Sequence, residues 1–286
     1  MTANDCLARC RETGCTLGAL SIRLEQEAGT FLPDILSRLD DMLRVMEAEA
    51  ENALHAPVYS VSGLTGGDGY LYENYRKKGH SLLGEIPALA TAYALSASET
   101  NAAMGRIVAC PTAGSCGIVP ACVLSVSRAR KIDREKVLEA LACAGLLGML
   151  IDEHASLAGA QGGCQAECGS ASAMAAAAIV EMLGGTPEQA FHAGAIAIKN
   201  MLGLVCDPVA GLVEIPCIKR NVGGVSVALS AADLALAGVT SRIPFDDAVD
   251  AMNRVGKALP AALRETALGG LATTESGKEM RKKVFG

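Results

Sequence analysis

The sequence lacks tryptophan and is poor in aromatic residues, which make up 3% of its 286 residues. Ala, Gly, Leu and Val must therefore fill most of the core that a chain of this length buries. Small side chains let helices approach closely, and no window keeps the alternating period of a β-strand for long. We expect an all-α fold, a compact multi-helix domain whose glycine-rich loops carry the site. The expected domain spans residues 1–286, with residues 1–55 as an alternative N-terminal helical extension.

The sequence also lacks an excess of basic residues, because its formal net charge is −6. Nucleic acid is therefore not an expected partner. The longest strongly apolar run, residues 137–151, is interrupted by Glu139 and is shorter than the ~20 residues that cross a bilayer. The first residues have no apolar signal-peptide core. We expect a cytoplasmic protein without a membrane partner, and in that reducing compartment the cysteines should be free or metal-bound.

Although the chain has eleven cysteines, it has no CxxC pair, so it matches neither a zinc finger nor a ferredoxin pattern. Three cysteines stand beside glycine or proline, which mark turns and breaks between helices. These are found in Gly163-Cys164, Cys206-Asp207-Pro208 and Pro216-Cys217. Three thiols directed from separate breaks suit a soft metal with one position left open. Plain packing of buried thiols is the alternative, and a zinc site that uses Cys164 and Cys168 is another.

The other cysteines are expected to pack as small apolar residues, with Cys116 as a spare ligand because it lies in a loop. That loop, residues 110–117, and a second one, residues 60–69, are rich in Gly, Ser and Thr. Such loops present N–H and hydroxyl groups that hold an anion such as a carboxylate. Residues 60–69 do not form a P-loop, because no Gly-Lys-Ser/Thr follows. A plain connector is the alternative for residues 60–69.

Apolar periodicity predicts an amphipathic helix over residues 32–53. Two helices are expected between residues 81 and 109, separated near residues 98–101. Further helices are expected over residues 133–151, 171–183, 222–237 and 246–259. Thr186-Pro187-Glu188-Gln189 is a start signal for another helix, since it places Thr at the N-cap, Pro at the first helical position and Gln three residues after the cap.

Three motifs together resemble the iron–sulfur L-serine dehydratases. They are Gly163-Cys164-Gln165-Ala166-Glu167, the run from Cys206-Asp207-Pro208 to Ile215-Pro216-Cys217, and Pro111-Thr112-Ala113-Gly114-Ser115 with Gly117-Ile118-Val119-Pro120. The length of the chain and its Lys282-Lys283-Val284-Phe285-Gly286 end resemble the separate alpha chain of the two-subunit form. The resemblance covers the chain from about residue 20 onward.

The resemblance implies a carbon–oxygen lyase that converts L-serine to pyruvate and ammonia. It implies that Cys164, Cys206 and Cys217 hold a [4Fe–4S] cluster whose fourth iron faces the substrate. It places two segments near that substrate, Thr65-Gly66-Gly67-Asp68 and the Thr112 to Ser115 loop. It also implies a beta subunit as partner, which would carry a Ser-Ser-His-Thr motif that this chain lacks.

Removing water from serine requires a base for the α-proton and assistance for the departing hydroxide. An open iron would bind the hydroxyl oxygen as a Lewis acid. A pyridoxal phosphate route is disfavoured, because no lysine stands in a glycine-rich phosphate-binding context. His154 is a candidate base, although a histidine at a helix end is the commoner role, and the beta subunit is the other expected source of the base. The alternatives are a non-catalytic subunit that only holds the cluster, and a zinc-dependent lyase or hydrolase.

Overall fold

Thirteen α-helices form the structure, a computed structural model that describes all residues 1–286. The chain has no β-strand, and its only bridges are two isolated ones, Tyr59 with Gly66 and Cys206 with Arg264. The predicted all-α fold is confirmed. No helix combines the length and the apolar character that crossing a bilayer requires.

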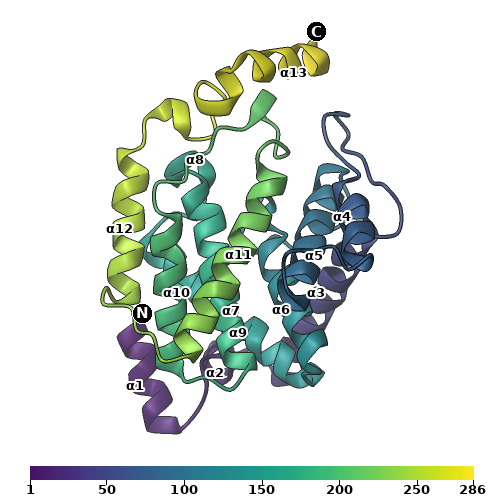
Figure 1. Cartoon of the computed structure of the whole chain (residues 1–286). Helices are drawn as coiled ribbons and strands as arrows, with labels where there is room; N and C mark the ends of the chain where they lie inside the picture. The colour runs from purple at the N-terminus through teal and green to yellow at the C-terminus, as the bar shows by residue number, and fades with distance from the viewer.

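Helix α9 (Ser170–Met182) lies at the centre of the bundle (Figure 1). It packs against four helices: α6 (Ile118–Arg130), α7 (Arg134–His154), α10 (Pro187–Met201) and α11 (Cys217–Leu236). Its sequence, SASAMAAAAIVEM, is buried on all sides except at Glu181. Alanine favours the helix and leaves little bulk between helix axes. This composition explains how a core with few aromatic residues is filled.

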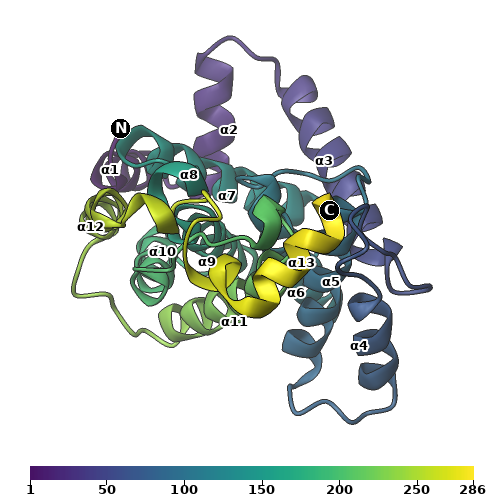
Figure 2. The same ribbon diagram turned by 90° about the horizontal axis from the view of Figure 1, so that it is seen from above.

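The first three helices are α1 (Ala3–Thr13), α2 (Leu17–Glu27) and α3 (Leu32–Asn52). Helices α2 and α3 form a hairpin at one side of the bundle (Figure 2). Helix α2 packs against α7, and α3 packs against α5 (Glu85–Ala102). Leu39, Leu43, Met46 and Ala50 face inward from α3, as its periodicity predicts. One buried hydrophobic cluster includes residues from Ala3 to Met252. The assignment of residues 1–286 to a single domain stays a prediction.

The prediction of two helices between residues 81 and 109 is wrong, because α5 is one continuous helix through residues 98–101. Its polar residues have partners that let the helix continue. Thr100 donates to the carbonyl of Ser96 at 2.8 Å, and Glu99 accepts from the first amides of α4 (Asp68–Lys77). Helix α4 begins inside the predicted loop of residues 60–69 and packs against α5.

Other predicted helix starts agree closely with the structure. Thr186 forms a complete capping box with Gln189 at the start of α10. Helix α12 (Phe245–Ala258) begins one residue before the predicted 246. Helix α11 begins earlier than the predicted residue 222, so Cys217 is its first residue. The last helix, α13 (Glu275–Phe285), crosses the end of the bundle (Figures 1 and 2) and packs against the short turn η3 (Val209–Gly211).

Candidate metal centre

A glycine turn places Cys164 after the short helix α8 (Gly159–Gly162). Gly163 has a φ of 76°, and a Cβ there would lie 2.7 Å from Leu259 Cδ1 and 2.9 Å from the Leu204 oxygen. Only glycine fits this position without strain. The π-helical turn η2 (Gln165–Gly169) follows at once. The amide and side chain of Gln165 attach the turn to the segment after α10, through the Leu204 carbonyl and the Gly203 N–H.

Backbone pairing fixes Cys206 beyond the end of α10. Its N–H donates to the Leu263 carbonyl at 2.9 Å, and its carbonyl accepts from the Glu265 N–H at 2.8 Å. Cys217 is held differently, because it is the first residue of α11 and follows Pro216. Each of the three predicted cysteines therefore lies where a helix begins or where the chain is irregular.

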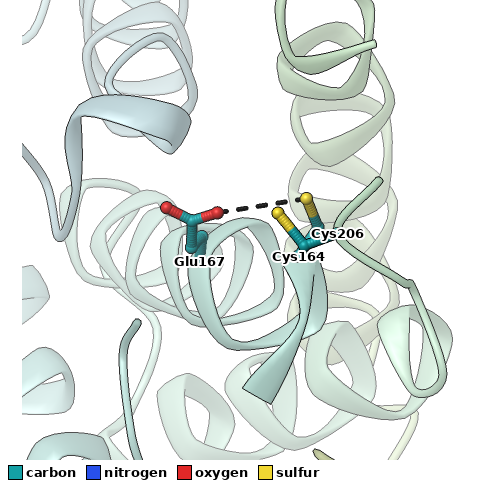
Figure 3. A group of neighbouring side chains, drawn as sticks. All are labelled: Cys164, Glu167 and Cys206. Atoms are coloured by element: carbon teal, nitrogen blue, oxygen red, sulfur yellow. Dashed lines mark hydrogen bonds between the residues drawn. The ribbon is translucent and has the colours of Figure 1, made fainter. Parts of the chain in front are cut away.

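The sulfurs of Cys164 and Cys206 and a carboxylate oxygen of Glu167 lie within 4.8 Å of one another. Figure 3 shows the three side chains directed toward a common point. The Cys164 sulfur is 3.9 Å from Glu167 Oε2. The structure thus brings two of the three predicted cysteines directly together. Burial first, and then the charges of Cys164 and Glu167, raise the pKa of the Cys217 thiol to about 12, so Cys217 lies within electrostatic reach of the group.

Cys164 carries the negative charge of this group. Hydrogen bonds from the thiols of Cys168 and Cys206, assisted by the Arg220 guanidinium, lower its pKa to about 3 in spite of burial. Arg220 Nη1 lies 3.4 Å from the sulfur, and Nη2 bonds to Asp207 Oδ1 at 2.8 Å. The pKa of the Cys206 thiol is raised in turn, because it donates to the charged sulfur. A thiolate, rather than a thiol, binds metal.

Glu167 was not selected from the sequence. Its Oε1 accepts a hydrogen bond from the Thr112 hydroxyl at 2.8 Å, and burial raises the pKa of its carboxyl to about 7. The signal that would have found it is spacing. Residues three apart on a helical turn lie on one side, so an acid three positions after Cys164 is a natural companion ligand.

The loop of Thr112 and Ser115 lies against the same group. The two hydroxyls are 3.2 Å apart, and Thr112 reaches Glu167. Asn221, in the second turn of α11, fastens this loop through the Gly117 N–H at 2.9 Å and the Gly114 carbonyl at 2.8 Å. The predicted substrate loop is therefore held at a fixed position relative to the start of α11.

The Thr65 to Asp68 segment is tied to residues that flank Cys217. The Thr65 hydroxyl donates to Glu214 Oε2 at 2.8 Å, and Lys219 pairs with the carboxylate of Asp68. Several amides of this segment already have partners. The Gly67 N–H donates to the Val58 carbonyl, and the Asp68 N–H donates to Glu99. The contribution of Thr65, Gly66, Gly67 and Asp68 to substrate binding stays a prediction.

His154 is exposed at the end of α7, and its Nε2 lies 3.0 Å from the carbonyl oxygen of Met1. Its own carbonyl accepts from Asn253. None of these hydrogen bonds joins it to the cysteines or to Glu167, so its role as a base remains a prediction that no contact supports.

Most of the remaining cysteines pack as small apolar residues, as expected from the sequence. Six of them belong to the hydrophobic core: Cys6, Cys10, Cys110, Cys122, Cys143 and Cys168. Cys164, Cys206 and Cys217 do not belong to it. Cys116 is buried, and its sulfur lies 3.9 Å from the Ala97 carbonyl rather than in the converging group. Cys168, the partner that the zinc hypothesis requires, bonds to the Cys164 sulfur but, like Cys217, is outside the set of three converging ligand atoms.

The fold and the site define an all-helical protein with a buried cysteine and glutamate group of the kind that holds a metal ion. The family model described as serine dehydratase alpha chain matches residues 12–272. The chain belongs to this family.

Named relatives agree with the family model. The probable L-serine dehydratase alpha chain of Bacillus subtilis (strain 168) is 54% identical over 253 residues, 88% of this chain and 84% of that protein. The L-serine dehydratase alpha chain of Peptoniphilus asaccharolyticus is 47% identical over 283 residues, 98% of this chain and 97% of that protein. The L-serine dehydratase of Streptomyces coelicolor is 38% identical over 279 residues, 95% of this chain but 60% of that protein.

Proposed function

We propose that this chain is the alpha chain of an L-serine dehydratase, a lyase that removes water from L-serine and yields pyruvate and ammonia. The family and the names of its relatives support the reaction. The observation that carries the proposal is the convergence of Cys164, Cys206 and Glu167 beside the Thr112 hydroxyl. Residues 1–286 are proposed to act as one domain.

The residues present fit a [4Fe–4S] cluster in their donor chemistry. Such clusters are held by cysteine thiolates, and Cys164 is already the favoured thiolate of its group. Cys164, Cys206 and Cys217 all lie outside the hydrophobic core, unlike Cys168. Arg220 offsets the negative charge that thiolates bring. Cys164, Cys206 and Cys217 are therefore the proposed ligands.

A cluster with one iron free of cysteine supplies, when bound, a Lewis acid for the departure of the substrate hydroxyl. The protein's own groups would orient the substrate. The Ser115 hydroxyl would donate to the serine carboxylate, and the Thr112 oxygen would accept from the substrate, because Thr112 donates its own proton to Glu167. The Thr65 to Asp68 segment, which is held by the bond from Thr65 to Glu214, is the second proposed substrate-binding segment. The bond from Thr112 to Glu167 fixes the position of this loop, and hence of Ser115, relative to the sulfurs.

A separate beta subunit is the proposed partner. Two relatives are named alpha chains, and this chain spans only 60% of the Streptomyces coelicolor protein. The missing part of the active site, including a base if His154 is not the base, would then come from the beta subunit.

A zinc-dependent lyase or hydrolase is the second candidate, because two cysteines and one glutamate within 4.8 Å also form a zinc donor set. Metal analysis after anaerobic purification separates the two. The proposed function predicts iron and sulfide in equal amounts, and pyruvate formation from L-serine when the beta subunit is added. A subunit that only holds the cluster would show no spectral change on addition of serine.

Replacing Cys206 or Cys217 by alanine should abolish the brown colour and the activity, since a cluster requires its thiolates. Cys122→Ala is the matched control, because its thiol is fully buried in the core. This variant should keep both. Colour and activity retained in C206A and C217A would refute the ligand assignment.

A further inference from the structure

The carboxylate of Glu167 has no cationic partner. It takes part in none of the protein's salt bridges. The guanidinium of Arg220, which lies beside Cys164, bonds instead to Cys164, to Asp207 and to the Val205 carbonyl. Carboxylates away from water are paired with a cation or coordinate a metal. Glu167 is only partly exposed, so a bound metal ion would supply the cationic partner that the chain itself does not provide.

The two oxygens of Glu167 are placed differently. Oε1 is held by the Thr112 hydroxyl at 2.8 Å. Oε2 faces the Cys164 sulfur at 3.9 Å. One oxygen thus fixes the side chain, and the other is directed at the sulfurs that the cluster would use. This is the arrangement of a ligand held by a supporting hydrogen bond.

Two glycines leave room for this carboxylate. A Cβ at Gly159 would lie 2.6 Å from Glu167 Oε2 and 3.2 Å from the Cys206 sulfur. A Cβ at Gly114 would lie 2.8 Å from Oε1. Real Cβ atoms essentially never come within 3.0 Å of a non-bonded atom, so a side chain at either glycine would have to displace the Glu167 carboxylate.

We infer that Glu167 is the fourth protein donor of the cluster site, and that its Oε2 binds the iron left without a cysteine when substrate is absent. The inference rests on the proposed function. Carboxylate oxygen is a harder donor than thiolate, so it marks one iron as different from the other three. An oxygen donor of this kind is also easier for a substrate oxygen to replace than a fourth thiolate would be.

The test uses the full chain, purified anaerobically with its beta subunit, and two variants. Glu167→Gln keeps the size of the side chain and its contact with Thr112 but removes the anionic oxygen. Glu181→Gln is the matched control, because Glu181 is another glutamate whose pKa burial raises to about 7, and it bonds to the Gly18 N–H on another side of the bundle. Iron and sulfide content and the Mössbauer spectrum are recorded without serine.

We expect the wild type and E181Q to show one iron with a distinct quadrupole doublet. In E167Q this doublet should shift, and one iron should be lost on mild oxidation about tenfold faster, the scale seen when a residue that supports a metal site is removed. The three-iron product is counted by its paramagnetic resonance signal. Identical doublets and equal rates of iron loss in E167Q and the wild type would overturn the inference.

Two further outcomes also decide between the inference and its alternatives. If E167Q accumulates no cluster, the Glu167→Asp variant is measured in its place, because it restores a carboxylate at this position. A distinct iron in E167D supports the inference, and an empty site in both variants overturns it. If the wild type itself contains no iron and sulfide, the proposed function fails, which is a result that the variants cannot imitate.

Discussion

Asn221 fixes the distance between the Thr112 loop and α11, and its loss has a calculable effect. The side chain is 1% exposed. It accepts from the Gly117 N–H and donates to the carbonyls of Gly114 and Cys217. The substitution Asn221→Leu keeps the number and branching of the side-chain heavy atoms and removes all three hydrogen bonds.

The cost follows from what is left without a partner. The Gly117 N–H and the Gly114 carbonyl are buried, and each would lose its bond to Asn221. An unsatisfied buried group costs ~1–3 kcal/mol. The Cys217 carbonyl is placed to keep the helical bond that a residue at the start of α11 makes. We therefore expect N221L to lower the free energy of unfolding by about 2–5 kcal/mol.

Urea unfolding of the chain, followed by circular dichroism, measures this cost. With a slope near ~3 kcal/mol/M, the midpoint should fall by about 1 M. Asn253→Leu is the control, because Asn253 makes a single exposed hydrogen bond, to the His154 carbonyl. This variant should change the free energy of unfolding by less than ~0.5 kcal/mol. The KM for serine should rise in N221L while the iron content holds. Equal midpoints for the two variants would refute the reasoning.

Three other substitutions test separate parts of the structure. Burial raises the pKa of the Glu49 carboxyl to about 8 from 4.5. The folded state then binds the proton more tightly than the unfolded chain. The free energy of unfolding of the wild type should therefore fall by about 4 kcal/mol relative to that of E49Q as the pH rises from ~5 to ~8. Urea midpoints of the two proteins that change in parallel over this range would contradict this. Gly159→Ala should lower the iron content of the purified protein, because the added Cβ would clash with Glu167. Gly145→Ala is the control and should not lower it, because no atom lies within 4 Å of a Cβ there. Equal iron contents in the two variants would show that Glu167 can move aside. Thr186→Ala should cost ~1 kcal/mol of stability through loss of the capping box, measured in urea.

The helices that could be predicted are those whose signals are local. Thr186 and Gln189 form their capping box within one turn, and the buried face of α3 follows from its 3.6-residue period. The break expected at residues 98–101 was wrong for the opposite reason. Ser, Thr and Asn disfavour a helix interior where their side chains compete with the backbone, whereas Glu is a good helix former. Here Thr100 donates to the Ser96 carbonyl of its own helix, and Glu99 accepts from the Asp68 N–H of α4, 31 positions away.

The same distinction separates the parts of the site. The three cysteines stand beside glycine or proline, so the sequence pointed to them as candidate ligands, whereas Glu167 was missed although it stands one turn after Cys164. Arg220 and Thr112 are different, because they meet the group from 56 and 55 positions away in the chain. No spacing rule pairs a guanidinium with a sulfur across such a gap. Candidate ligands can therefore be proposed from the sequence, whereas the contacts that lower the pKa of Cys164 and leave Glu167 without a salt bridge exist only in the folded chain.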